Sequence, residues 1–166
     1  MLAIIGGSGL TTLSSLDVSH REVVRTPYGE PSGAFVFGQI CGHPAMFLPR
    51  HGYGHTIPPH MVNYRANLWA LHHLGATGVI SVASVGGIRA DLQPGDIVIP
   101  DQIIDYTWGR KSTFFDGVGS PVTHVDFTEP YDATLRAKLR GAGEGLGIAM
   151  KIGGVYAATQ GPRLES

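Results

Sequence analysis

Short apolar runs alternate with polar and glycine-rich stretches along this chain, and they predict a series of buried strands. Leu2 to Ile5 is a continuous apolar run that ends in a glycine loop, which is typical of a buried strand. Ala34 to Ile40 and Ala45 to Leu48 predict two strands joined as a hairpin. Three further strands are predicted, at Val79 to Val82, Ile97 to Ile99 and Gly154 to Thr159.

Two helices are predicted between these strands. The first runs from about Met61 to Leu74, after two prolines, and Gly75 is a natural stop for it. The second runs from Asp132 to about Leu146, with glycines at its end. Because buried strands alternate with helices, the predicted fold class is α/β.

Two long stretches carry no such pattern. Residues 11–34 are polar and contain turn signals at Pro27-Tyr28-Gly29 and Pro31-Ser32-Gly33. Residues 101–127 are rich in aromatic side chains, which favours a lid or a subunit contact over idle chain. No repeat or boundary divides the sequence, so we expect a single domain over residues 1–166.

Composition narrows the class of protein. A hydrophobic content of 43% is ordinary for a globular chain, and a net charge of -1 gives no reason to expect nucleic acid or an anionic membrane as partner. The single cysteine, Cys41, excludes an internal disulfide and suits a reducing compartment. The apolar start lacks the basic flank of a signal peptide, and no stretch reaches transmembrane length. These features predict a cytoplasmic protein.

Candidate chemistry gathers where predicted strands end. In open α/β sheets ligands bind at the carboxyl ends of strands, and four glycine-rich or basic junctions follow such ends. An arginine fork beside an imidazole suits an oxyanion, and the bare amides of a glycine loop can cradle a phosphate. The four junctions are Gly7–Gly9, Arg50–His51, Ala83–Gly87 and Gly161–Ser166.

Plainer interpretations stand beside these. The first glycine loop is neither a Walker loop nor a dinucleotide fingerprint, and alone it is equally a tight turn. His51, His55 and His60 lie among glycines and prolines with no acidic residue nearby, so no metal site is expected.

Several other polar residues have structural interpretations. Asn63, Arg65 and Asn67 are expected to tie the first helix to neighbouring loops. The aspartates at 96, 101 and 105 follow a turn or strand ends, which favours capping over a carboxylate cluster.

Several motifs in this order resemble the purine nucleoside phosphorylase and 5'-methylthioadenosine phosphorylase family, and among its members the bacterial S-methyl-5'-thioinosine phosphorylases. They are Gly6-Gly7-Ser8-Gly9-Leu10, Arg50-His51-Gly52, the run Val62 to Leu71, Ser84-Val85-Gly86-Gly87-Ile88, Gln93-Pro94-Gly95-Asp96, Thr123 to Phe127 and Thr159-Gln160-Gly161-Pro162-Arg163. The resemblance implies a mixed central sheet flanked by helices, and phosphorolysis of a 5'-methylthio purine nucleoside, methylthioinosine before methylthioadenosine. Inorganic phosphate would be a co-substrate, with no cofactor, and the chain would form homotrimers.

The resemblance also implies roles for residues. Ser8, Arg50 and His51 would bind the phosphate, with Arg50 and His51 as the catalytic pair, and the backbone at Ala83 and Ser84 would complete the site. The substrate would meet another set: Leu164, Glu165 and Ser166 near the base, and His124 reaching a neighbouring subunit's 5'-methylthio pocket.

The family pattern continues beyond the Gly-Pro-Arg motif, whereas this sequence stops at Ser166. If the molecule ends there, the fold is C-terminally incomplete, and we expect weak or no turnover and an exposed apolar sheet face. Two alternatives stay open: a general 6-oxopurine nucleoside phosphorylase, and a non-catalytic phosphate- or nucleoside-binding fragment.

Overall fold

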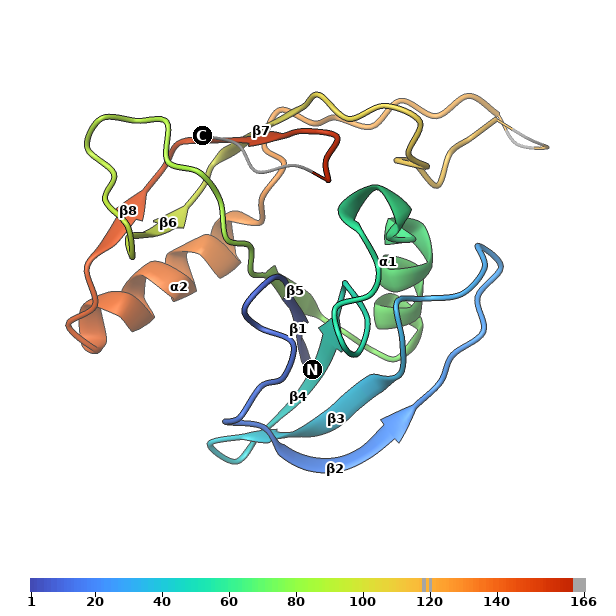
Figure 1. Ribbon diagram of the computed structural model, residues 1–166, viewed down its shortest axis with the longest axis horizontal. Coiled ribbons are helices and arrows are strands. Elements are labelled where there is room, and N and C mark those ends of the chain that lie inside the picture. The colour runs from blue at the N-terminus through green and yellow to red at the C-terminus, as the bar shows by residue number, and fades with distance from the viewer. Residues whose placement is uncertain (118, 120, 163–166) are drawn as a thin grey trace. The chain divides into compact units, whose positions relative to one another are not determined.

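A mixed five-stranded sheet holds most of the buried side chains. Its strands lie in the order β2-β3-β4-β1-β5, with β1 parallel to β4 and β5, and β2, β3 and β4 antiparallel neighbours (Figure 1). Their bounds are β1 Leu2–Gly6, β2 Asp17–Glu22, β3 Phe35–Ile40, β4 His43–Pro49 and β5 Gly78–Ser81. The predicted hairpin is confirmed as β3 and β4, joined through Cys41 and Gly42, which both have positive φ.

The computed structural model describes residues 1–117, 119 and 121–162 of the chain. Two compact units are present. The first consists of Met1–Val85 and Arg110–Phe114 with residues 161–162, and the second of Gly86–Gly109 and Phe115–Gln160. The single-domain expectation stays a prediction.

Successive side chains of a strand point to opposite faces of the sheet. The first sheet carries a cluster of buried apolar side chains on each face. Ala3, Ile5, Met46 and Leu48 face helix α1, Tyr64–His73, whose Leu71 is fully buried against them. On the opposite face, β3 and β4 contribute a second cluster of buried side chains, which packs with the segment after the glycine loop: Leu16, Val36, Ala45 and Phe47.

Helix α1 is confirmed, but it begins at Tyr64, three residues after its predicted start near Met61, and it ends at His73, close to the predicted end. A 3-10 turn, Pro59–Met61, precedes it, and the Asn63 side chain caps its first turn by accepting a hydrogen bond from the Ala66 amide at 3.1 Å. Gly75 follows its last turn with φ +85, a conformation that favours glycine.

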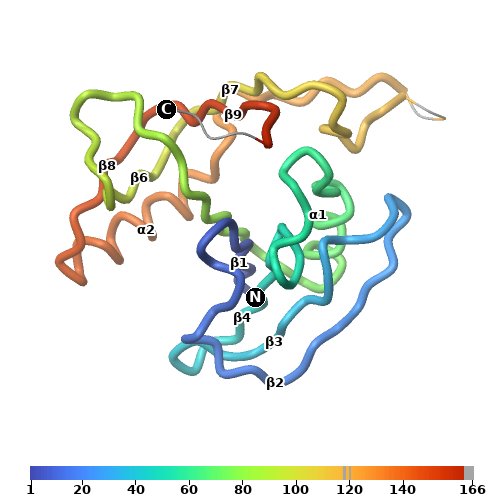
Figure 2. Tube along the Cα trace, viewed as in Figure 1, coloured from blue at the N-terminus to red at the C-terminus, as the bar shows by residue number. Residues whose placement is uncertain are grey.

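The second unit consists of two parallel strand pairs and one helix. Strand β6, Ile97–Ile99, pairs with β8, Met150–Ile152, and β7, Gln102–Asp105, pairs with β9, Val155–Ala158. Figure 2 traces this part of the chain from green through red. Helix α2, Ala133–Gly145, is capped by Asp132, whose carboxylate accepts the Leu135 amide at 2.6 Å. Its Gly143 lies against Met150 of β8.

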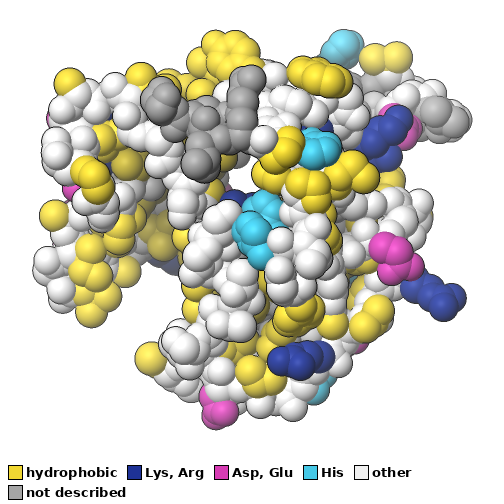
Figure 3. All heavy atoms as spheres, viewed as in Figure 1, with side chains coloured by type: hydrophobic (Ala, Val, Ile, Leu, Met, Phe, Trp, Pro, Cys, Tyr) yellow, Lys and Arg dark blue, Asp and Glu magenta, His cyan; other side chains and the backbone are white. Residues whose placement is uncertain are grey.

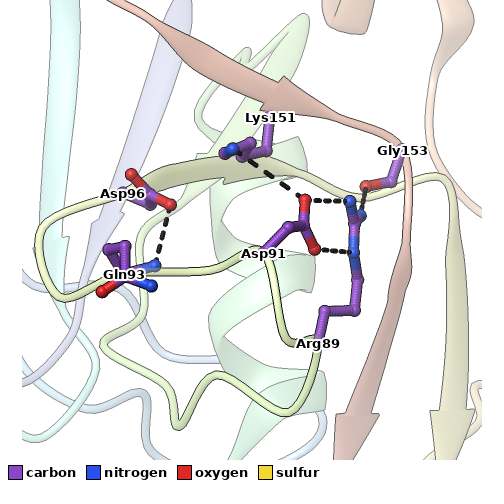
Figure 4. A network of polar contacts seen from close by, with 6 residues as sticks. All are labelled: Arg89, Asp91, Gln93, Asp96, Lys151 and Gly153. Atoms are coloured by element: carbon purple, nitrogen blue, oxygen red, sulfur yellow. Dashed lines mark hydrogen bonds and ion pairs between the residues drawn. The ribbon is translucent and has the colours of Figure 1, made fainter.

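A polar network holds the loop before β6 to the strand pair. Arg89 donates from Nε and Nη2 to the two carboxylate oxygens of Asp91, and from Nη1 to the Gly153 carbonyl, while Lys151 pairs with the same aspartate (Figure 4). The Arg89 guanidinium lowers the pKa of Asp91. Asp96 accepts the Gln93 amide at 2.9 Å, and Asp101 and Asp105 likewise accept backbone amides, so the prediction that these aspartates have structural roles is confirmed.

Three strands were not predicted from the sequence. Every residue of β2 is exposed, so β2 shows no apolar alternation and is held by backbone pairing with β3. Strands β7 and β8 are four and three residues long, too short for a pattern to stand out. Within the described ranges, no helix is long and apolar enough to cross a membrane.

Candidate functional site

Three strand ends meet at one edge of the first sheet. Because β1 is parallel to β4 and β5, with Gly6 opposite Pro49 and Ile5 opposite Ser81, the residues after each strand emerge side by side. The Arg50 amide donates to the Gly6 carbonyl at 3.0 Å, and the Val82 amide donates to the Ile5 carbonyl at 2.9 Å. The structure therefore brings together the junctions Gly7–Gly9 and Arg50–His51 and the start of the third junction, at Ala83 and Ser84.

The Arg50 side chain crosses this edge. Its Nη1 donates to the Val82 carbonyl at 2.7 Å, which orients the guanidinium over the end of β5. On the other side the guanidinium lies against Gly7, where a Cβ would overlap it. The absence of a side chain at Gly7 thus leaves room for the Arg50 guanidinium (the arginine fork), a group suited to binding oxyanions.

The other predicted phosphate-site residues lie around this fork. Ser8, Ala83 and Ser84 are exposed, and the Ser84 hydroxyl donates to the Ser8 carbonyl at 3.3 Å, so the two loops are joined directly. Gly9 has φ +82, which turns the chain sharply after Ser8. The loops after β1 and β5 therefore present backbone and hydroxyl groups beside the guanidinium.

His51 follows Arg50 and is buried, with 5% of its surface exposed. Its Nδ1 donates to the Ile57 carbonyl at 2.8 Å, while the Ile57 amide donates to the His51 carbonyl at 2.9 Å. Its ring lies beside that of His55, with the centroids 4.6 Å apart. On the face seen in Figure 3, histidine side chains lie near the middle and at several other places, and acidic side chains are few.

The surroundings of His51 favour its neutral form. Burial lowers the pKa of His51 most, and the positive charges on Arg50 and His55 lower it further, against an opposing contribution from the Ile57 carbonyl. The imidazole is thus expected to be uncharged near neutral pH, and the fixed positive charge at this edge comes from Arg50.

A hollow of about 220 Å³ opens next to Arg50 between α1 and the sheet. The sheet contributes Ile5, Val79 and Ser81, and α1 contributes Tyr64, Asn67 and Leu68. Its lining is mainly apolar, so it suits an uncharged group more than a second anion.

Polar residues of α1 connect it to neighbouring loops, as predicted. The buried Asn67 accepts the Ser32 amide at 2.8 Å and donates to the Ser32 hydroxyl at 2.9 Å. Asn63 donates to the Tyr28 carbonyl, and Arg65 donates to the Thr113 carbonyl and lies over the Tyr28 ring. These contacts hold the start of α1 to the loops that carry Tyr28, Ser32 and Thr113.

The structure does not test the predicted substrate residues. His124 is exposed in the second unit, and its expected role stays a prediction. Leu164, Glu165 and Ser166 lie outside the described residues, as does most of the fourth junction. Sequence reasoning missed the Val82 and Ile57 carbonyls, because backbone acceptors leave no signature in side-chain identity.

Comparisons with known proteins agree with the fold and the motifs. A model of the Phosphorylase superfamily matches residues 1–166. A probable S-methyl-5'-thioinosine phosphorylase of Xanthomonas campestris is 51% identical over 165 residues, which cover 99% of this chain and 66% of that protein. A 6-oxopurine nucleoside phosphorylase of Pyrococcus furiosus is 45% identical over 170 residues, covering 99% of this chain and 63% of that protein.

The search of solved structures also finds nucleoside phosphorylases. Methylthioadenosine phosphorylase from Schistosoma mansoni in complex with adenine superposes with a TM-score of 0.92 at 34% identity, over 99% of this chain and 66% of that one. This chain thus spans about two thirds or less of the length of these relatives. Because the family model matches along the whole sequence and the solved relative shares its α/β fold, the chain belongs to the Phosphorylase superfamily.

Proposed function

We propose that this chain acts in the phosphorolysis of a 5'-methylthio purine nucleoside, with S-methyl-5'-thioinosine preferred over methylthioadenosine. The products are the purine base and 5-methylthioribose 1-phosphate, in purine salvage. Inorganic phosphate is the co-substrate, and the proposal includes no cofactor or metal. The working form is a cytoplasmic homotrimer in which His124 reaches a neighbouring copy's substrate.

The observation that carries the proposal is the arginine fork at the meeting point of three strand ends. Arg50 is oriented by the Val82 carbonyl at 2.7 Å and lies against Gly7, beside the loops that carry Ser8 and Ser84. Such a cluster of a guanidinium, hydroxyl groups and loop amides suits an anion with several oxygens. Relatives named as nucleoside phosphorylases, which consume phosphate, support this choice of anion.

The reaction needs little covalent help from the protein. A phosphate oxygen forms a bond to the anomeric carbon of the ribose while the glycosidic carbon–nitrogen bond breaks. The electron pair of that bond leaves with the purine, which takes up a proton. Arg50 would hold the nucleophile in line and balance its charge as positive charge develops on the sugar, so that positioning and electrostatics supply the rate.

Arg50→Ala tests the assignment of the phosphate. We expect the dissociation constant for phosphate to rise by about 10- to 100-fold, because a hydrogen bond to a charged group contributes about 1.5–3 kcal/mol. The affinity for nucleoside should change much less. Calorimetric titration with each ligand measures both constants without requiring turnover.

The matched control for this experiment is Arg25→Ala, which removes an exposed arginine that follows β2. It should leave the phosphate affinity unchanged. Equal losses of phosphate and nucleoside affinity in Arg50→Ala would show that the fork binds a different part of the substrate.

The base preference has its own test, since relatives are named after methylthioinosine, methylthioadenosine and 6-oxopurine nucleosides. Release of purine from methylthioinosine, methylthioadenosine and inosine is compared in the presence of phosphate. Faster release from inosine would favour the general 6-oxopurine enzyme. Phosphate binding without release from any of them, also in a chain of the relatives' length, would favour a binding module.

A further inference from the structure

The hydrogen bond from His51 fixes the position of its proton. Nδ1 lies 2.8 Å from the Ile57 carbonyl oxygen, which is an acceptor only. Nδ1 therefore carries a hydrogen in every protonation state that keeps this bond. In the neutral ring, Nε2, on the side of the imidazole away from Ile57, is then a hydrogen-bond acceptor.

The backbone of the loop from Arg50 to Ile57 holds the Ile57 carbonyl within hydrogen-bond distance of the His51 Nδ1. Gly52, Gly54 and His55 have φ values of 73, 79 and 57, so three residues in a short span adopt the left-handed conformation and turn the chain back. The Gly52 amide donates to Pro49 at 2.9 Å, and the Ile57 amide closes the loop on the His51 carbonyl at 2.9 Å. The proton position is thus set by main-chain geometry.

Burial, and after it the neighbouring titratable groups, favour the neutral form of His51 by lowering its pKa. The titratable groups that influence it among the described residues are Arg50, adjacent in sequence, and His55, whose ring centroid is 4.6 Å away. Both disfavour a second positive charge, and burial has a larger effect in the same direction on the pKa of His51. His55 occupies a left-handed position, where most residues other than glycine are strained.

We infer that His51 is a specificity-determining residue: neutral, and with Nε2 as acceptor, it favours an anion that has an O–H group to donate, and His55 is the positioning residue that keeps it so. The inference rests on the proposed phosphate site. Near neutral pH monohydrogen phosphate carries one P–O–H, whereas sulfate carries none. Sulfate would bring an oxygen lone pair against the lone pair of Nε2 and offer that acceptor no hydrogen.

Three measurements on the intact chain test this. Nitrogen NMR of the His51 ring at neutral pH should give a protonated Nδ1 and an unprotonated Nε2. Calorimetry at pH 7.5 should give phosphate an affinity about 10-fold or more above that of sulfate, since a site built to accept a hydrogen bond rejects an analogue that lacks the donor. On acidification the imidazolium donates from Nε2, so this preference should shrink.

His55→Asn separates the His51 effect from the protonation of phosphate itself. Asparagine tolerates left-handed backbone, so the loop should keep its path without the second imidazole. The pH at which the NMR titration of His51 and the loss of preference occur should both shift upward. The control, His43→Asn, changes an exposed histidine at the first residue of β4 and should shift neither.

The outcomes separate this inference from the proposed function. Equal affinity for phosphate and sulfate at pH 7.5, or a His51 ring with its proton on Nε2, overturns the inference alone. No phosphate binding at all overturns the proposed function and the inference with it. The measurements on the unsubstituted chain decide this even where His55→Asn does not fold.

Discussion

A methyl group at Gly7 would overlap the guanidinium of Arg50, so this glycine is where the backbone and the proposed anion site meet most closely. Gly7→Ala should weaken phosphate binding by about 10-fold, because the displaced fork loses part of its hydrogen bonding to the anion. The free energy of unfolding should fall by no more than about 1 kcal/mol, since the crowded group is the end of a flexible side chain. Phosphate titration and thermal unfolding measure the two effects.

Two other glycine-to-alanine substitutions serve as comparisons for Gly7→Ala. At Gly6 a Cβ would meet the Leu10 carbonyl and the Phe47 ring, so Gly6→Ala should lower stability by about 1–3 kcal/mol. At Gly33 the nearest atom is 3.4 Å away, so Gly33→Ala should change little. A Gly7→Ala variant with full phosphate affinity would mean that the arginine can bind the anion from another rotamer.

At the residue scale, the sequence predicted that Arg50 and His51 lie close to the glycine loop. Both segments follow the carboxyl ends of predicted strands, and both contain residue types suited to binding an anion. The bond from His51 to the Ile57 carbonyl could not be predicted in this way. It depends on left-handed backbone at Gly52, Gly54 and His55, and the sequence gives no reason to expect that conformation at a histidine.

Among the elements, α2 is the one whose sequence conflicts most with its structure. It contains Gly141, Gly143 and Gly145 in its second half, although glycine is about 1 kcal/mol less favourable than alanine inside a helix. Its prediction took these glycines as the end of the helix, whereas all three lie within it. The strands that escaped prediction, β2, β7 and β8, are exposed or short, so long-range pairing determines them.

The three glycines offer a comparison within one helix. Gly141 is exposed and a Cβ there meets nothing within 4 Å, so Gly141→Ala should raise the free energy of unfolding by about 0.5–1 kcal/mol. At Gly143 the Cβ would lie 2.8 Å from Sδ and Cε of Met150, so Gly143→Ala should gain less or destabilise. Urea unfolding of both variants checks this; an equal gain would mean that the Met150 side chain moves aside without cost.

For the molecule as a whole, burial is uneven between the two units. The apolar clusters that pack on the sheet belong to the first unit, whereas Ile99 and Gly143 are the buried residues among those described in the second. Large apolar side chains such as Ile88 at 91% and Leu146 at 74% are exposed there, and yellow side chains are spread over the face in Figure 3. Composition alone predicted a core for the chain without predicting that burial would concentrate in one unit.

Hydrogen exchange should report this difference directly. Amides of β1, β3, β4 and α1 should exchange slowly, because opening them exposes buried apolar surface, which costs about 25 cal/mol per Å². Amides of β6 to β9 should exchange much faster at the low protein concentration where the chain is alone. Protection that rises in β6 to β9 with protein concentration would mean that a second copy covers their apolar side chains. Slow exchange in both units at every concentration would contradict the burial described here, since β6 to β9 would then have to be stabilised by something other than apolar packing within their own unit.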